Sequence, residues 1–180
     1  MDLTEKKISS KELYRSPSYT FTLDTVRLPD GREHTREVFH HPGGVAVLAI
    51  NEKGQVIVEH QYRYAVGQTI LEIPAGKMDK IPGEKPEETA LRELREETGY
   101  IAKEMTFLGK IYTSPGVMSE VLYFYLARGL SREERELDED EFLTVEWMGM
   151  ETLLDKIAKG EIMDCKMISA FFFAKLKGYL

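Results

Sequence analysis

The stretch from Pro86 to Gly99 constrains this chain most, because it predicts a short helix with well-marked ends. Proline suits the first turn of a helix, where its missing N–H leaves no bond unmade, and glycine suits the position just past the last turn. Glu87 and Glu88 place negative charge at the positive end of the helix dipole. We therefore expect a helix over residues 86–98.

Three carboxylates lie along one edge of this predicted helix. A helix turns about 100° per residue, so Glu93 and Glu97 lie roughly 40° apart, and Glu96 lies roughly 60° from Glu93. Like charges four residues apart destabilise a helix by roughly 0.2–0.5 kcal/mol, so helix stability does not explain them. Stacked carboxylates are the ligands that a hard divalent cation prefers. The acidic edge therefore predicts a cation site.

Composition limits the classes of protein that this chain can represent. Its 180 residues, 42% of them hydrophobic and 31% charged, predict one globular domain plus an appendage. A net charge of −7 disfavours nucleic acid as a partner, and no apolar run approaches the roughly 20 residues of a membrane span. The single cysteine excludes a disulfide framework, and residues 1–10 lack the apolar core of a signal peptide. We expect a cytoplasmic protein.

The remaining elements are predicted from alternating apolar residues and from turn residues. We expect strands over residues 19–28, 32–40, 45–50, 55–60, 70–73, 105–113, 121–127 and 142–148. We expect helices over residues 151–159 and 164–176, the second with Asp164 as its N-cap. This order predicts an α/β fold in which helices pack on a mixed sheet. The first two strands form an antiparallel hairpin that is marginal alone, so it needs a partner surface.

The segment from Glu84 to Tyr100 closely resembles the signature of the Nudix hydrolases. It reads Glu, seven residues, then Arg-Glu-Leu-Arg-Glu-Glu-Thr-Gly-Tyr. Counted back from Glu84, the signature glycine falls at Met78, whereas Gly76 lies two residues earlier. We interpret this as a two-residue insertion in the loop that follows Gly76. The resemblance implies a Nudix-type α/β/α sandwich with a mixed β-sheet.

Short segments outside this motif resemble the ADP-ribose pyrophosphatase branch of the family. Residues 71–76 read Leu-Glu-Ile-Pro-Ala-Gly, Pro115 stands where that branch has a proline, and Glu120 matches a recurrent glutamate. By resemblance, residues 1–40 form an N-terminal β arm that dimerises the protein, and residues 41–180 form the hydrolase domain. The protein is then a homodimer.

The resemblance also implies a metal site and a catalytic base. Mg²⁺, with Mn²⁺ as the alternative, would be held by Glu93, Glu96, Glu97 and the carbonyl of Ala75. We expect Arg92 to orient these ligands by pairing with Glu96 or Glu84. Related enzymes take the base from a late acidic loop, which here is residues 137–142. The candidate catalytic residues are Glu141 first, Glu139 second, and Glu96 on the helix.

The substrate-binding candidates leave alternatives open. Arg63 either clamps phosphate or is a surface arginine beside two tyrosines. Glu72 either binds the ribose or adenine side of the substrate or caps the sheet. The resemblance adds Gly76, Pro115 and Glu120 to the candidates.

The reaction implied is metal-dependent hydrolysis of ADP-ribose, or of another ADP-sugar, to AMP and ribose 5-phosphate. The partner is then a small nucleoside diphosphate, without nucleic acid or membrane. One alternative is a Nudix activity on NADH, a nucleoside triphosphate, coenzyme A or a different nucleotide sugar. The other is a non-catalytic sensor that binds ADP-ribose.

Overall fold

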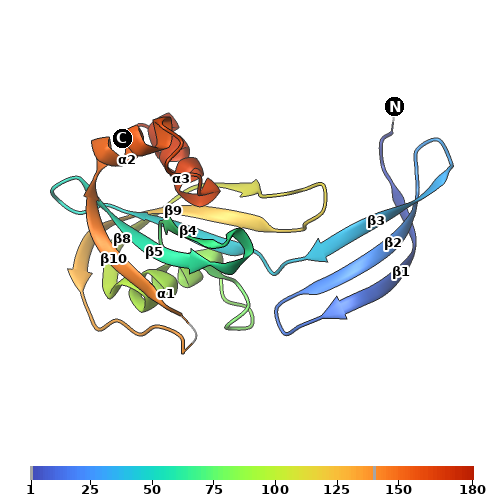
Figure 1. Cartoon of the computed structure of the whole chain (residues 1–180), viewed down its shortest axis with the longest axis horizontal. Coiled ribbons are helices and arrows are strands. Elements are labelled where there is room, and N and C mark those ends of the chain that lie inside the picture. The colour runs from blue at the N-terminus through green and yellow to red at the C-terminus, as the bar shows by residue number, and fades with distance from the viewer. Residues whose placement is uncertain (1, 140) are drawn as a thin grey trace. The chain divides into compact units, whose positions relative to one another are not determined.

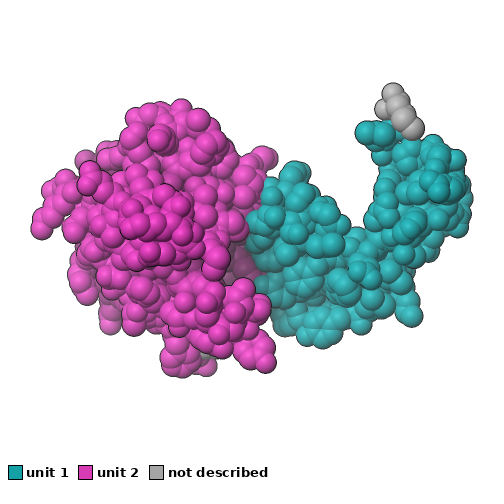
Figure 2. Space-filling view, turned by 45° about the horizontal axis from the view of Figure 1, so that its top comes forward, with its two compact units in different colours: residues 1–43, 112–121 teal, residues 44–111, 122–180 magenta. Residues whose placement is uncertain are grey.

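The computed structural model describes residues 2–139 and 141–180, which divide into two compact units (Figure 2). Unit 1 consists of Met1–Gly43 and Tyr112–Val121, and unit 2 consists of Gly44–Ile111 and Leu122–Leu180. No helix in these described ranges is both long and apolar enough to cross a membrane. The predicted acidic helix and the strands between residues 44 and 77 belong to unit 2.

Unit 1 contains a three-stranded antiparallel sheet in the order β1 (Lys6–Arg15), β2 (Thr20–Arg27), β3 (Glu33–His40). The predicted hairpin is confirmed, since β2 pairs with β3 in a continuous register. Strand β1 was not expected. All of its residues are exposed, so it carries no burial pattern that sequence periodicity could reveal.

Unit 2 combines two sheets with three α-helices (Figure 1). One sheet has the order β7-β4-β9-β8, with β4 parallel to β9 and antiparallel to β7, and the other has the antiparallel order β10-β5-β6. The strands are β4 (Gly44–Ala49), β5 (Gln55–Arg63), β6 (Gln68–Glu72), β7 (Ala75–Lys77), β8 (Tyr100–Tyr112), β9 (Val121–Arg132) and β10 (Leu143–Gly149). The helices are α1 (Pro86–Thr98), α2 (Met150–Ala158) and α3 (Cys165–Leu176), with a short 3₁₀ helix at Tyr64–Val66.

Strand β4 is buried on both faces and separates two hydrophobic cores. Ala46, Leu48 and Ile50 pack in the core that contains residues of α2 and α3. Val45, Val47 and Ala49 pack in the core that contains Ala90 and Leu94 of α1. Helix α1 therefore lies on one side of the strands, with α2 and α3 on the other (Figure 1). The predicted α/β/α sandwich with a mixed sheet is confirmed.

Strand β5 shows the same alternation and so determines where its polar residues lie. Val56 and Val58 belong to the core shared with α2 and α3, whereas Ile57 belongs to the core shared with α1. Successive side chains of a strand point to opposite faces. Glu59, two residues beyond Ile57, is therefore on the face that carries α1.

Candidate active site

Helix α1 begins and ends as its sequence predicts. The N–H of Lys85 donates to Oε2 of Glu88 over 2.9 Å at the start of the helix. Gly99 follows the helix with φ 71°, and its N–H donates to the carbonyl of Arg95 over 2.8 Å. A positive φ favours glycine, so Gly99 stops the helix where the acidic edge ends.

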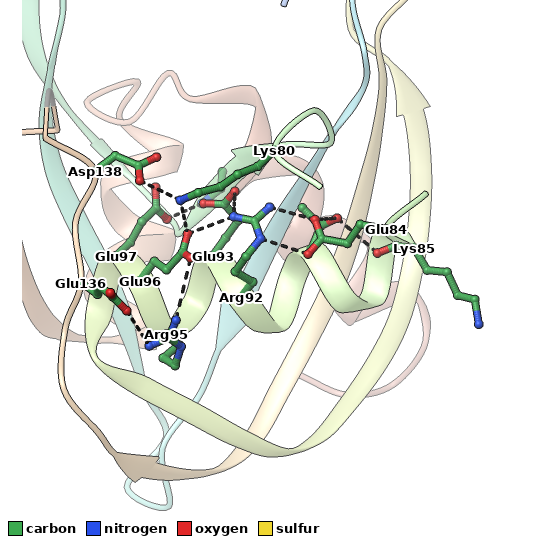
Figure 3. A network of polar contacts seen from close by, with 12 residues as sticks. Lys80, Glu84, Lys85, Arg92, Glu93, Arg95, Glu96, Glu97, Glu136 and Asp138 are labelled. Carbon is green, nitrogen blue, oxygen red and sulfur yellow. Dashed lines mark hydrogen bonds and ion pairs between the residues drawn. The ribbon is translucent and has the colours of Figure 1, made fainter. Parts of the chain in front are cut away.

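The three helix carboxylates leave α1 on the same side (Figure 3). Glu93 is 8% exposed and Glu97 is 2% exposed, which is rare for charged residues. Oε2 of Glu97 accepts a hydrogen bond from the N–H of Ala75 over 2.9 Å. The start of β7 thus lies against the helix, as a shared ligand site requires. That the carbonyl of Ala75 is itself a ligand stays a prediction.

Gly76 is needed because the carboxyl group of Glu93 packs directly on its backbone. A Cβ built at this position would lie 2.0 Å from Cδ of Glu93. Any other residue would displace that carboxylate. The glycine that faces the helix is therefore Gly76 and not position 78. The two-residue insertion in the loop after it stays a prediction.

Arg92 is the centre of an ion-pair network (Figure 3). Its guanidinium donates to both carboxylate oxygens of Glu84, over 3.0 and 2.9 Å, and to Glu93 and Glu96 over 2.7 and 2.9 Å. Burial opposes its charge, but these carboxylates outweigh burial and raise the pKa of Arg92. The predicted pairing with Glu84 and Glu96 is confirmed, and Glu93 is an additional partner. A guanidinium held this way fixes the orientation of three carboxylates.

Lys80 is a second positively charged side chain in this network, after Arg92, and it was not predicted from the sequence. Its Nζ lies 3.0 Å from Oε2 of Glu96 and 2.7 Å from Oδ1 of Asp138, so it joins the loop before α1 to the acidic segment after β9 (Figure 3). No three acidic, histidine or cysteine side chains within residues 2–139 and 141–180 already surround a single cation position. Glu93 and Glu96 instead share their oxygens with Arg92 and Lys80.

The chemistry of the donors nevertheless fits a hard divalent cation. Burial raises the pKa of Glu93 and raises that of Glu97 further, and the negative charges of Glu59 and Glu93 add to the effect at Glu97. Buried carboxylates that repel one another are stabilised by an added positive charge. All of these groups offer oxygen, which is the ligand atom that Mg²⁺ and Mn²⁺ accept.

Glu59 is a member of this site that sequence reasoning missed. It is 2% exposed and lies directly opposite Glu72 in the antiparallel pairing of β5 with β6. Burial, followed by the charge of Glu72, raises the pKa of Glu59. The available signal was a glutamate directly after the apolar run Val56-Ile57-Val58, within the strand expected over residues 55–60.

Glu72 is buried at 2% exposure and is neutralised by two cations. Nε of Arg63 donates to one of its oxygens over 2.7 Å, and Nζ of Lys166 donates to the other. Lys166 also contacts Oδ1 of Asp164 over 2.7 Å, and Asp164 caps α3 as predicted. Arg63 and Glu72 are thus brought together, but their contact with substrate stays a prediction.

The acidic segment after β9 is attached to the C-terminal end of α1. The N–H of Glu133 donates to the carbonyl of Gly99 over 2.8 Å, and the N–H of Glu136 donates to that of Glu96 over 3.1 Å. Arg135 donates from Nε to the carbonyl of Glu97 and from Nη2 to that of Leu143 over 3.0 Å. These bonds satisfy carbonyls that a helix end leaves unpaired. They also connect α1 to the start of β10.

Glu141 lies within electrostatic reach of the buried carboxylates. Burial is the main reason that the pKa values of Glu59, Glu93 and Glu97 are raised, and the charge of Glu141 contributes at all three. Glu141 is half-buried, whereas Glu139 is exposed. Asp140, which falls in the predicted acidic loop, lies outside the described residues.

Two predicted substrate residues, Pro115 and Glu120, belong to unit 1. Within that unit, Glu120 accepts a hydrogen bond from Oγ1 of Thr113 over 2.5 Å and lies 3.4 Å from Nε2 of His41. These contacts hold the segment that carries both residues. Their role toward a substrate stays a prediction.

Comparison with known proteins identifies the family. Residues 40–170 match the model of the NUDIX domain. The chain is 44% identical over 177 residues to an ADP-ribose pyrophosphatase of Bacillus subtilis, covering 97% of this chain and 95% of that protein. It is 39% identical over 175 residues to a methanol dehydrogenase activator of Bacillus methanolicus, covering 96% and 94%. The crystal structure of an ADP compounds hydrolase superposes with a TM-score of 0.84 at 24% identity and full coverage of both chains, which supports the fold. The chain therefore belongs to the Nudix family.

Proposed function

We propose that this protein hydrolyses the diphosphate linkage of ADP-ribose and related ADP-sugars to AMP and ribose 5-phosphate. The observation that carries the proposal is the buried acidic site of α1, where Glu93 and Glu97 lie within the electrostatic reach of Glu141. The similarity to an ADP-ribose pyrophosphatase along nearly the whole chain supports this choice of substrate.

The acidic residues of α1 are the proposed cation ligands. Glu93, Glu96, Glu97 and the carbonyl of Ala75 would hold Mg²⁺, or Mn²⁺ in its place. A divalent cation, when bound, neutralises the diphosphate and makes a nearby water more acidic. Arg92 keeps the carboxylates of Glu93 and Glu96 oriented through hydrogen bonds of 2.7 and 2.9 Å, and Glu84 in turn holds Arg92.

The chain's own groups then bind substrate and move the proton. Water attacks phosphorus, the bridging P–O bond breaks, and Glu141 accepts the proton that the water loses; Glu139, or Glu96 on the helix, are the alternatives for this step. Arg63, which uses Nε on Glu72, has its remaining N–H groups available for a phosphate oxygen. Glu72 and Gly76 of unit 2 are further proposed substrate-binding residues, and Pro115 and Glu120 of unit 1 are proposed from the resemblance alone.

We further propose that the protein is a cytoplasmic homodimer joined through the N-terminal β arm, residues 1–40, with residues 41–180 as the hydrolase domain. Exposed apolar side chains on β1, at Ile8, Leu13 and Tyr14, support an interface there. The net charge of −7 supports the expectation that nucleic acid is not a partner.

A substrate panel tests the proposed reaction. The purified chain is incubated with Mg²⁺ or Mn²⁺ and with ADP-ribose, other nucleotide sugars, NADH, coenzyme A and nucleoside triphosphates, and the products are separated by chromatography. We expect ADP-ribose to give AMP and ribose 5-phosphate with the highest kcat/KM. No turnover of ADP-ribose with either cation would reject the proposal.

A second candidate function is the activation of a partner enzyme. It is favoured by the 39% identity to a methanol dehydrogenase activator over almost the whole chain. The rate of a methanol dehydrogenase, measured with and without added chain, tests it. A rate increase that persists in a Glu97→Gln variant without hydrolytic activity would indicate a binding function rather than catalysis.

A further inference from the structure

Glu59 is a buried carboxylate that lacks a counter-charge of its own. It is 2% exposed, and its Oε1 has no hydrogen-bond partner among the described residues. A buried polar atom without a partner costs roughly 1–3 kcal/mol, and more when it carries charge. A glutamate in this position is stabilised either by a proton or by an added positive charge.

The position of Glu59 directs it toward the acidic edge of α1. It shares the α1 side of β5 with Ile57, and its partner on β10 is Val145, which packs in the same core. On β6 its partner is Glu72, and Ala75, three residues further along the chain, donates its N–H to Oε2 of Glu97 over 2.9 Å. The strand carboxylate and the helix carboxylate thus face the same space.

The positive groups near Glu59 are bonded to other acceptors. Arg63 uses its Nε on Glu72, and Lys166 is shared between Glu72 and Asp164. Arg135 donates hydrogen bonds to two backbone carbonyls. Glu72 is consequently neutralised while Glu59, its cross-strand neighbour, is not.

We propose that Glu59 is an additional ligand for a divalent cation, which it holds together with Glu97 beside the acidic edge of α1. The proposal deepens the proposed function, because both require a divalent cation at this helix. Hard cations take several carboxylate oxygens at once, and a strand and a helix that each offer one can hold a cation from two sides. The cation then supplies the charge that Glu59 lacks.

Direct titration with Mn²⁺ tests the proposal in full-length, substrate-free protein. Isothermal titration calorimetry of the native chain and of Glu59→Gln, which keeps the shape and removes the charge, measures the number of bound ions and their affinity. We expect Glu59→Gln to lose one bound ion or to bind Mn²⁺ roughly tenfold or more weakly. Glu146→Gln is the matched control, since it removes one exposed carboxylate from the neighbouring strand β10. Its affinity should stay within about twofold of the native value, an effect below about 0.4 kcal/mol.

Thermal unfolding separates a ligand from a purely structural acid. If Glu59 binds the cation, Glu59→Gln raises the melting temperature in EDTA, because the substitution removes the repulsion between Glu59 and the neighbouring carboxylates. It also reduces the increase in melting temperature that Mn²⁺ produces. An equal shift with and without Mn²⁺, or unchanged Mn²⁺ stoichiometry and affinity, would overturn the proposal. Glu59→Val, which extends the apolar run of β5, replaces the glutamine variant if the latter does not fold.

Failure of this proposal and failure of the proposed function give different results. Titration without substrate does not depend on which nucleotide is cleaved. Loss of a Mn²⁺ site in Glu59→Gln without ADP-ribose turnover by the native chain would retain the ligand and reject the reaction. Turnover of ADP-ribose by the native chain, with unchanged Mn²⁺ binding in Glu59→Gln, would retain the reaction and reject Glu59 as a ligand.

Discussion

Glutamates are neutralised in different ways on helix α1 and on the paired strands β5 and β6. On α1, Glu93 and Glu96 share Arg92, a neighbour on the same helix, and Glu96 also contacts Lys80. On the strands, Glu72 pairs with Arg63 and with a lysine of α3, whereas Oε1 of Glu59 has no hydrogen-bond partner in the part of the chain that the structure describes. The helix therefore supplies the arginine that orients its own glutamates. The strand pair takes part of its positive charge from helix α3, and only one of its two glutamates is neutralised.

Glu97→Gln removes the most buried helix carboxylate and is the test of this comparison with the largest expected effect. We expect kcat for the proposed reaction to fall about 1,000-fold, because loss of a cation ligand costs several kcal/mol in the transition state. Steady-state kinetics with ADP-ribose and Mg²⁺ measures it. Glu87→Gln, an exposed carboxylate in the first turn of α1, is the control on the same helix. Near-native activity of Glu97→Gln would remove Glu97 from the site.

Glu141→Gln tests whether the acidic segment after β9 completes the helix site. We expect kcat to fall about 100-fold, as for loss of a general base, with Mn²⁺ affinity nearly unchanged. Glu139→Gln should retain native rates, since that residue is exposed. The opposite pattern would assign the base to Glu139.

Lys166→Met tests the neutralisation of the strand pair. Removing this lysine leaves buried Glu72 with Arg63 alone, so we expect the free energy of unfolding to fall by about 2 kcal/mol. Urea denaturation in EDTA measures it. Lys175→Met, an exposed lysine on the same helix, should change stability little. Equal effects of the two variants would show that the contact between Lys166 and Glu72 contributes nothing.

Arg135→Lys tests the connection between α1 and the segment that carries Glu141. Lysine keeps the charge but cannot donate from a planar fork to the carbonyls of both Glu97 and Leu143. We expect kcat to fall about tenfold through misplacement, with KM nearly unchanged. Arg132→Lys is the control, since Arg132 lies over the ring of Tyr100. A fall in both variants alike would assign the effect to general destabilisation.

Features that depend on residues close together in the sequence could be predicted from the sequence alone. The start of α1 at Pro86, its end at Gly99, and the pairing of Arg92 with Glu84 and Glu96 all depend on residues within a few turns of one another. Helix geometry places Arg92 beside Glu96, because the rotation per residue is constant, and Glu84 lies only two residues before the helix begins. Alternating apolar residues and a turn identified the hairpin of β2 and β3, and residue type identified the cap at Asp164.

The acidic helix, its orienting arginine and the Nudix resemblance thus follow from the sequence alone. The folded chain adds that Glu59 and Glu72 lie opposite each other, that Lys80 and Lys166 pair with acidic residues of the site, and that β1 forms a third strand. These features depend on which elements pair and pack, or, for β1, on a strand that is exposed throughout and has no burial pattern. Lys166 and Glu72 are 94 residues apart, and no periodicity encodes which strand or loop will pack beside another. Strand pairing and helix packing make those contacts, and they place an unneutralised glutamate beside a predicted cation site.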